Sequence, residues 1–176
     1  MRLLLAICTL ILLAAADYCQ ARAIEGTVKA VYDGDTILLV TSGASRVKTR
    51  LYGIDAPETA KPDKPGQPFG GAAKRKLLSK IIGRQVSAEI IEIDQYQRAV
   101  AVVRYAGRDI NREMVAEGMA WAYRHYLQGP YASEYIGAET RARARREGLW
   151  RDANPQPPWE FRQALRGGRY PGKGHW

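Results

Sequence analysis

Apolar and polar positions alternate along the first third of the chain in a pattern that predicts β-strands. The apolar-rich runs are residues 24–32, 36–40 and 47–54, and the turn sequences between them are residues 33–35 and 41–45. Asp33-Gly34 can adopt the positive φ values of a tight hairpin. Pro57 ends the third run, because proline has no N–H to donate to a sheet. The pattern predicts a three-stranded meander, with Asp55 and Glu58 on a turn just beyond its last strand.

Helical periodicity begins after this meander. Residues 71–82 carry apolar side chains at i, i+4, i+5, i+8 and i+9, and Gly83 follows directly, which predicts a helix that ends at this glycine. Residues 84–93 alternate as a strand, but the apolar parity changes at Ile91, which predicts a β-bulge. The remaining predicted elements are a strand at 99–103, a short helix capped by Asp109 and a helix at 131–147. This order predicts an α+β fold, a five-stranded OB-type β-barrel with three helices.

The two ends of the chain differ in composition from the middle. Arg2, an uncharged apolar run from Leu3 to Ala16, and Ala21-Arg22-Ala23 predict a signal peptide over residues 1–23. The apolar run is shorter than the roughly 20 residues of a membrane-spanning helix, although an uncleaved anchor is the alternative. We therefore expect a secreted or periplasmic protein. Residues 152–176 are rich in proline, glycine and arginine, and we predict a peripheral or disordered tail after a folded domain at 24–151.

Charge and the few histidines and cysteines narrow the function. The formal net charge is +9, which indicates a polyanionic partner: nucleic acid first, then anionic envelope lipid or polysaccharide. Both cysteines, Cys8 and Cys19, fall in the predicted signal peptide, so the mature chain has no disulfide framework. The only histidines are His125 and His175. This composition excludes a His/Cys zinc site and leaves oxygen ligands, which suit Ca²⁺ or Mg²⁺.

Acids and arginines gather at the ends of the predicted strands. They are Asp35, Arg50, Asp55, Glu58 and Arg98. Carboxylates are ligands for hard cations, and planar guanidinium groups match the charge that builds on phosphate during phosphodiester cleavage. A glutamate can orient or deprotonate the attacking water. Taken singly, each residue also fits a plain role, as a hairpin turn, a surface ion pair or a surface carboxylate. Their combination favours a metal-assisted attack on phosphate.

The order of these residues resembles the signature of the thermonuclease (staphylococcal nuclease-like) family. The matching segments are Asp33-Gly-Asp-Thr-Ile-x-Leu and, ten residues later, Arg50-Leu-x-x-Ile-Asp-x-Pro-Glu58. The likeness continues through residues 94–98 to residues 147–150, so that it covers about 24–151. It implies a Ca²⁺-dependent nuclease. Together with the predicted signal peptide, we expect this nuclease to be exported, to be a monomer and to have no stable membrane partner after signal cleavage. Such an enzyme would hydrolyse the phosphodiester bonds of DNA and RNA with low sequence specificity.

The resemblance also implies a role for individual residues. The calcium ligands would be Asp35, Asp55 and the main-chain carbonyl of Ala56. The catalytic groups would be Arg50, Glu58 and Arg98. In this scheme Glu58 acts as the general base or positions the water, and the two arginines stabilise the transition state. Removing one such preorganised donor typically costs about 10²–10³ in rate.

Three tyrosines are candidates for contacting the bound nucleotide, by stacking and through their hydroxyls. They are Tyr96, Tyr123 and Tyr126. Packing in the core or at the barrel rim is the alternative for each. Gln95 stands where the family commonly has a lysine, which removes one phosphate contact and should reduce the salt dependence of binding by about one unit.

Two other functions fit the same chain. A non-catalytic nucleic-acid-binding OB module would use the barrel without cleavage, but such modules typically lack some of the acids or arginines that are present here. An envelope- or exopolysaccharide-associated protein of the same fold would fit the predicted export and the basic tail. Polysaccharide cleavage by paired carboxylates needs no metal, so tolerance of a chelator would favour it.

Overall fold

The computed structural model describes residues 23–168, so the predicted signal peptide, apart from Ala23, and residues 169–176 lie outside the described residues. The strands are β1 (Ala23–Asp33), β2 (Thr36–Thr41), β3 (Arg46–Leu51), β4 (Ile54–Asp55), β5 (Gln85–Ile93), β6 (Ala99–Tyr105), β7 (Arg108–Asp109) and β8 (Trp121–Ala122). The helices are α2 (Gly70–Ile81), α3 (Ile110–Ala116), α4 (Gly129–Ala144), α5 (Pro158–Arg166) and the 3₁₀ helix η2 (Gly148–Arg151). Within residues 23–168 no helix is long and apolar enough to span a bilayer.

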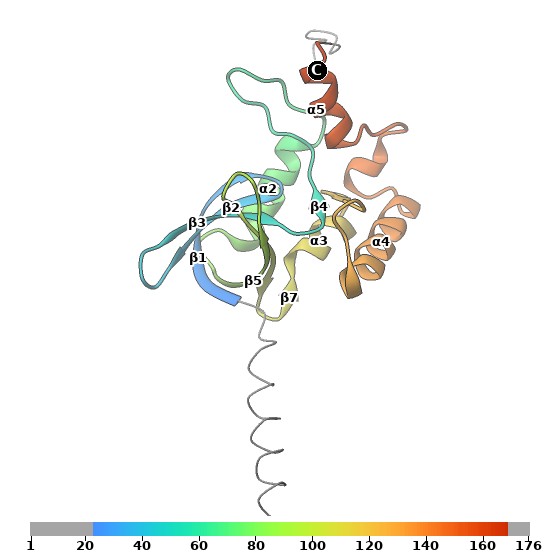
Figure 1. The fold of residues 1–176 in the computed structure, drawn as a ribbon. Helices are drawn as coiled ribbons and strands as arrows, with labels where there is room; N and C mark the ends of the chain where they lie inside the picture. The colour runs from blue at the N-terminus through green and yellow to red at the C-terminus, as the bar shows by residue number, and fades with distance from the viewer. Residues whose placement is uncertain (1–22, 169–176) are drawn as a thin grey trace, which may run out of the picture.

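Five strands close into the predicted barrel (Figure 1). The order is β3-β2-β1-β5-β6, with antiparallel neighbours, and a parallel pairing of β3 with β6 closes the ring. This pairing places Arg50 of β3 opposite Val100 of β6. The OB-type barrel is therefore confirmed. Its core continues into α2 and α3 through Leu77, Ile81 and Met114, all of which are fully buried.

Three local predictions are confirmed. The pairing of β5 with β6 shifts register between Ile90 and Glu92, which is the expected bulge. Helix α2 is followed by Gly83 at φ +70°, a left-handed conformation that a residue with a side chain adopts at a cost. The Asp109 carboxylate accepts a hydrogen bond from the Arg112 N–H at 2.9 Å and caps α3.

The third strand ends earlier than predicted. It stops at Leu51, and Tyr52-Gly53 form a turn in which Gly53 has φ +69°. A Cβ on Gly53 would lie 2.4 Å from Leu127 Cδ2, so the turn depends on glycine. Beyond it, Ile54 and Asp55 form the separate strand β4, which pairs with β8. The prediction that Asp55 lies on a turn outside any sheet is therefore wrong.

The C-terminal segment also differs from the prediction. Pro158–Arg166 forms α5, a fourth α-helix among residues 23–168, with Phe161 only 1% exposed. Trp159 packs edge-on against Trp121, with ring centroids 5.5 Å apart. Pro158 stands in the first turn, where its missing N–H has no partner to lose. The prediction of a peripheral or disordered tail is wrong for residues 158–166.

Ion pairs join α2 to α3 on one side of the barrel. Lys80 Nζ lies 2.7 Å from Glu113 Oε2 and 2.6 Å from Glu117 Oε1. Arg108 Nε donates to Glu113 Oε1 at 2.6 Å. The hydrogen bond from Arg108, together with Lys80, lowers the pKa of Glu113 to about 2. The charged form of this carboxylate therefore stabilises the contact between the two helices.

Replacing Glu113 with glutamine is expected to lower the free energy of unfolding at neutral pH by about 1–2 kcal/mol, after allowance for solvent screening. The folded-state pKa lies below the ordinary value of 4.5, so the stabilisation is complete above that pH and is lost as pH falls toward about 2. Urea unfolding of both proteins at several pH values checks this. A difference that stays constant from neutral to strongly acid pH would contradict it.

Candidate active site

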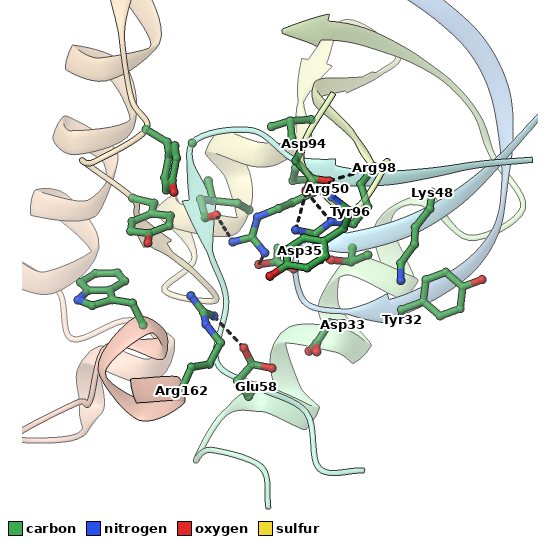
Figure 2. A pocket seen from close by; sticks show the side chains of 18 of the residues that line it. Tyr32, Asp33, Asp35, Lys48, Arg50, Glu58, Asp94, Tyr96, Arg98 and Arg162 are labelled. Carbon is green, nitrogen blue, oxygen red and sulfur yellow. Dashed lines mark hydrogen bonds and ion pairs between the residues drawn. The ribbon is translucent and has the colours of Figure 1, made fainter. Parts of the chain in front are cut away.

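One arginine brings two of the predicted metal ligands together. Asp35 lies in the turn between β1 and β2, and Asp55 lies in β4; their exposed fractions are 5% and 0%. Arg50, from β3, places Nη1 3.3 Å from Asp35 Oδ2 and Nη2 2.9 Å from Asp55 Oδ1. Figure 2 shows Arg50 reaching between strands toward Asp35. The sequence-predicted carboxylates therefore lie side by side.

The pKa values of both Arg50 and Asp55 are raised, that of Arg50 by neighbouring acids and that of Asp55 by burial. The charge on Asp35 raises the pKa of Arg50 above its ordinary value against the effect of burial, and Asp55 acts in the same direction. Burial raises the pKa of Asp55, and the hydrogen bond from Arg162 only partly offsets this rise. Two buried carboxylates next to each other gain from any added positive charge. The two acids supply the negative charge that a cation site needs, and in this structure Arg50 and Arg162 balance that charge.

The donor set fits a hard divalent cation. The Ala56 N–H donates to Asp35 Oδ2 at 3.3 Å, which places Ala56 beside the two acids, and Thr36 Oγ1 donates to Asp35 Oδ1 at 2.8 Å. Across residues 23–168 no cluster of three or more His, Cys, Asp or Glu side chains could hold a metal by itself. A cation here would therefore rely on Asp35, Asp55, a main-chain oxygen and water. Ca²⁺ and Mg²⁺ accept such oxygen-only sets.

Glu58 is fixed by its backbone and presents its carboxylate to the pocket. Its N–H donates to Gln67 Oε1 at 3.0 Å, and its carbonyl accepts from the Gln67 N–H at 2.8 Å. The N-terminus of α2 packs on the same peptide, since a Cβ on Gly70 would lie 2.1 Å from the Glu58 oxygen. The side chain itself is 22% exposed. Glu58 thus combines a rigid backbone with access to solvent, as a base or water-positioning group requires.

Arg98 is held at the rim by a tight turn between β5 and β6. Asp94 Oδ1 accepts the N–H groups of Tyr96 and Arg98, and Asp94 Oδ2 accepts from Arg98 Nε at 2.7 Å. Burial alone would raise the pKa of Asp94, but the hydrogen bonds from Arg98 and Tyr96 hold it below its usual value. The guanidinium lies 5.4 Å from the Tyr96 ring centroid. Arg98 is therefore oriented before any substrate binds.

The predicted residues converge on one pocket of about 510 Å³. Asp35, Arg50, Glu58, Arg98 and the three candidate tyrosines, Tyr96, Tyr123 and Tyr126, line it. Asp55 lies beneath it and contacts the lining residues Arg50 and Arg162. Tyr96 is 71% and Tyr126 50% exposed, which excludes core packing for these two. Tyr123 is half-buried because it stacks on Trp159.

Sequence reasoning missed Arg162 and Trp159, which α5 brings to this pocket. Arg162 Nη1 donates to Glu58 Oε1 at 2.8 Å and to Asp55 Oδ1 at 3.0 Å, and Nη2 donates to Asp55 Oδ2 at 2.8 Å. A signal was present: a proline followed by Trp159, Glu160 and Phe161 is a typical helix start with aromatic anchors. The density of prolines and glycines around it obscured that signal.

Comparison with known proteins agrees with this site. A family model described as "Staphylococcal nuclease homologue" matches residues 48–152. An uncharacterized endonuclease of Haemophilus influenzae is 40% identical over 76% of this chain and 70% of its own length. A micrococcal nuclease of Shigella flexneri is 38% identical over 80% of this chain and 81% of its own. A staphylococcal-like nuclease of Arabidopsis thaliana is 34% identical over 71% of this chain, which spans only 36% of the plant protein.

The chain belongs to the staphylococcal nuclease family. It is an endonuclease, a hydrolase whose substrate is nucleic acid. The family is generally metal-dependent, in agreement with the oxygen donors that Arg50 draws together.

Proposed function

We propose that this nuclease is a Ca²⁺-dependent phosphodiesterase that cleaves both DNA and RNA with little sequence preference. The carrying observation is that Arg50 contacts Asp35 and Asp55 at 3.3 and 2.9 Å, in a pocket that also presents Glu58 and Arg98. The proposal extends to location and assembly: the basic start and apolar run before Ala23 support export from the cytoplasm, and the enzyme acts as a monomer.

Each side chain then has a chemical task. Asp35, Asp55 and the main-chain oxygen of Ala56 would hold the cation, which when bound would supply positive charge to the scissile phosphate. Glu58 orients or deprotonates the water that attacks phosphorus. Arg50 and Arg98 donate to the phosphate oxygens on which charge develops. Tyr96 and Tyr126, being exposed at the rim, stack on bases, which every nucleotide permits.

Low sequence specificity follows from the chemistry of the lining. Its polar groups are mostly carboxylates and cations, which recognise phosphate and metal, while its aromatic rings accept the face of any base. The two alternatives are less well supported. A non-catalytic module does not need both arginines and Glu58 at one pocket, and the relatives named above carry the names of nucleases. An envelope polysaccharide role has no support in the site beyond charge.

Cleavage of single-stranded DNA, RNA and duplex DNA is expected to appear with added Ca²⁺ and to stop with EGTA. EGTA removes the cation held by Asp35 and Asp55, and with it the positive charge that stabilises the scissile phosphate. We therefore expect no cleavage to be detectable on gels. Mg²⁺ in place of Ca²⁺ tests the choice of ion. Cleavage that survives chelation contradicts the proposal. Binding of nucleic acid without cleavage, whichever cation is added, would favour the non-catalytic binding module.

A further inference from the structure

Helix α5 contributes a cation to the centre of the site. Arg162 contacts both carboxylate oxygens of Asp55 and one of Glu58, at 2.8 to 3.0 Å. Figure 2 shows Arg162 and Glu58 pointing toward one another, on the side of the pocket away from Tyr32 and Lys48. The side chain is 30% exposed, so it closes the site at the solvent boundary.

These contacts compete with a metal for Asp55, because they occupy three of the roughly four lone-pair sites of its carboxylate. Asp55 Oδ1 already accepts from Arg50 and Arg162, and Oδ2 accepts from Arg162. A carboxylate that ligates a divalent cation needs a free lone pair directed at it. The guanidinium groups of Arg50 and Arg162, 2.9 and 2.8 Å from Asp55 oxygens, also repel an incoming cation. Arg162 therefore competes with Ca²⁺ for Asp55, and turning Arg162 away favours binding of the cation.

The face of α5 that meets the pocket has the composition of a nucleic-acid contact. Trp159, Arg162 and Arg166 are spaced i, i+3 and i+7, and all three line the pocket. Trp159 stacks on Tyr123 at 5.1 Å with the rings 3° from parallel. An aromatic platform beside a row of cations is the usual surface for single-stranded nucleic acid.

We propose that α5 forms one wall of the nucleic-acid site and that Arg162 exchanges partners during binding. Without metal it neutralises Asp55; once a divalent cation takes Asp55, its guanidinium contacts a phosphate of the substrate strand. The released Arg162 remains on a helix anchored by the buried Phe161, so its guanidinium stays at the pocket and can donate to a phosphate of the substrate. The exchange also frees Glu58. This inference rests on the proposed metal-dependent cleavage.

Two opposite effects of Arg162→Gln test the exchange. Calorimetric titration with Ca²⁺, without nucleic acid, should show binding about tenfold tighter than in the wild type, because a competing charge is gone. At saturating Ca²⁺, KM for a single-stranded oligonucleotide should rise about five- to tenfold, because a phosphate contact is lost, and the salt slope should fall by about one.

Arg166→Gln is the matched control on the same helix. It removes the same charge from the same pocket lining, but Asp55 is held by Arg50 and Arg162. We expect it to raise KM without tightening Ca²⁺ binding more than about twofold. Arg112→Gln, an exposed residue of α3 outside the pocket lining, should change neither quantity. Arg162→Lys keeps the charge without the paired N–H groups, so its Ca²⁺ affinity should fall between wild type and Arg162→Gln.

The Ca²⁺ affinity and the KM of Arg162→Gln test the two parts of this inference separately. If Arg162→Gln binds Ca²⁺ as the wild type does, Arg162 does not compete with the cation for Asp55. If its KM is unchanged, α5 does not contact the substrate through Arg162. A lower kcat alone, with unaltered KM and Ca²⁺ affinity, would assign Arg162 a structural role and overturn the inference. Wild-type protein that neither binds Ca²⁺ nor cleaves overturns the proposed function, whereas active wild type with an indistinguishable Arg162→Gln overturns this inference alone. Thermal unfolding in Ca²⁺ confirms that each variant is folded.

Discussion

Replacing Glu58 with glutamine lowers kcat by about 10²- to 10⁴-fold, with a smaller change in KM, if this carboxylate handles the attacking water. The amide fills the same volume and still accepts from Arg162, but it cannot take a proton at neutral pH. The backbone of residue 58 is held by Gln67, so the substitution should not displace the loop. Steady-state kinetics on a single-stranded substrate at saturating Ca²⁺ measure both parameters.

Glu160→Gln provides the matched control for this experiment. Glu160 is an exposed carboxylate on α5, near the site but outside the lining of the main pocket. Glu160→Gln removes the same charge as Glu58→Gln. Because Glu160 is exposed and outside the lining of that pocket, kcat should stay within about twofold of the wild type. Glu58→Gln with wild-type kcat would show that another group activates the water.

Replacing Arg98 with lysine is expected to lower kcat by about 10²- to 10³-fold, because the charge remains but the planar pair of N–H donors does not. The structure adds a second, smaller effect. Asp94 orients the Arg98 guanidinium through Nε and Nη2, both 2.7 Å from Oδ2. Asp94→Asn keeps Oδ1 as an acceptor for the turn and weakens only this ion pair, so it should cost about tenfold.

Arg104→Lys is the control for the arginine chemistry. Arg104, in β6, pairs with Glu89 at 3.1 Å and does not line the pocket, so the change should leave kcat unaffected. We expect Arg98→Lys to lower kcat more than Asp94→Asn does. An Asp94→Asn variant slower than Arg98→Lys would mean that Asp94 itself takes part in the reaction.

Elements specified by neighbouring residues could be predicted from the sequence. Four such features appear in the structure: the β1–β2 hairpin, the Gly83 end of α2, the Asp109 cap and the parity change at Ile91. The positive φ values expected at Asp33-Gly34 are not found, because the turn is formed by Gly34 and Asp35 without them. The strand-end acids and arginines of the site could be identified because their order matches a family signature, and the barrel brings them to one pocket.

What could not be predicted depends on contacts between distant parts of the chain. Gly53 breaks the third strand because Leu127 packs where a side chain would be, and that contact is invisible to local periodicity. Arg162 reaches Asp55 and Glu58 from a segment whose prolines and glycines suggested disorder. A proline-rich approach to a helix and a proline-rich disordered tail have similar composition; the burial of Phe161 and the packing of Trp159 on Trp121 distinguish them here.

Closure of the barrel is also the step that assembles the catalytic centre. The parallel pairing of Thr49 with Ala99 joins strands far apart in the sequence, and only this pairing sets Arg50 and Arg98 around one pocket. Contacts of this kind form late in folding, because the long intervening loop must be ordered first. A nascent or unfolded chain therefore has no assembled catalytic centre.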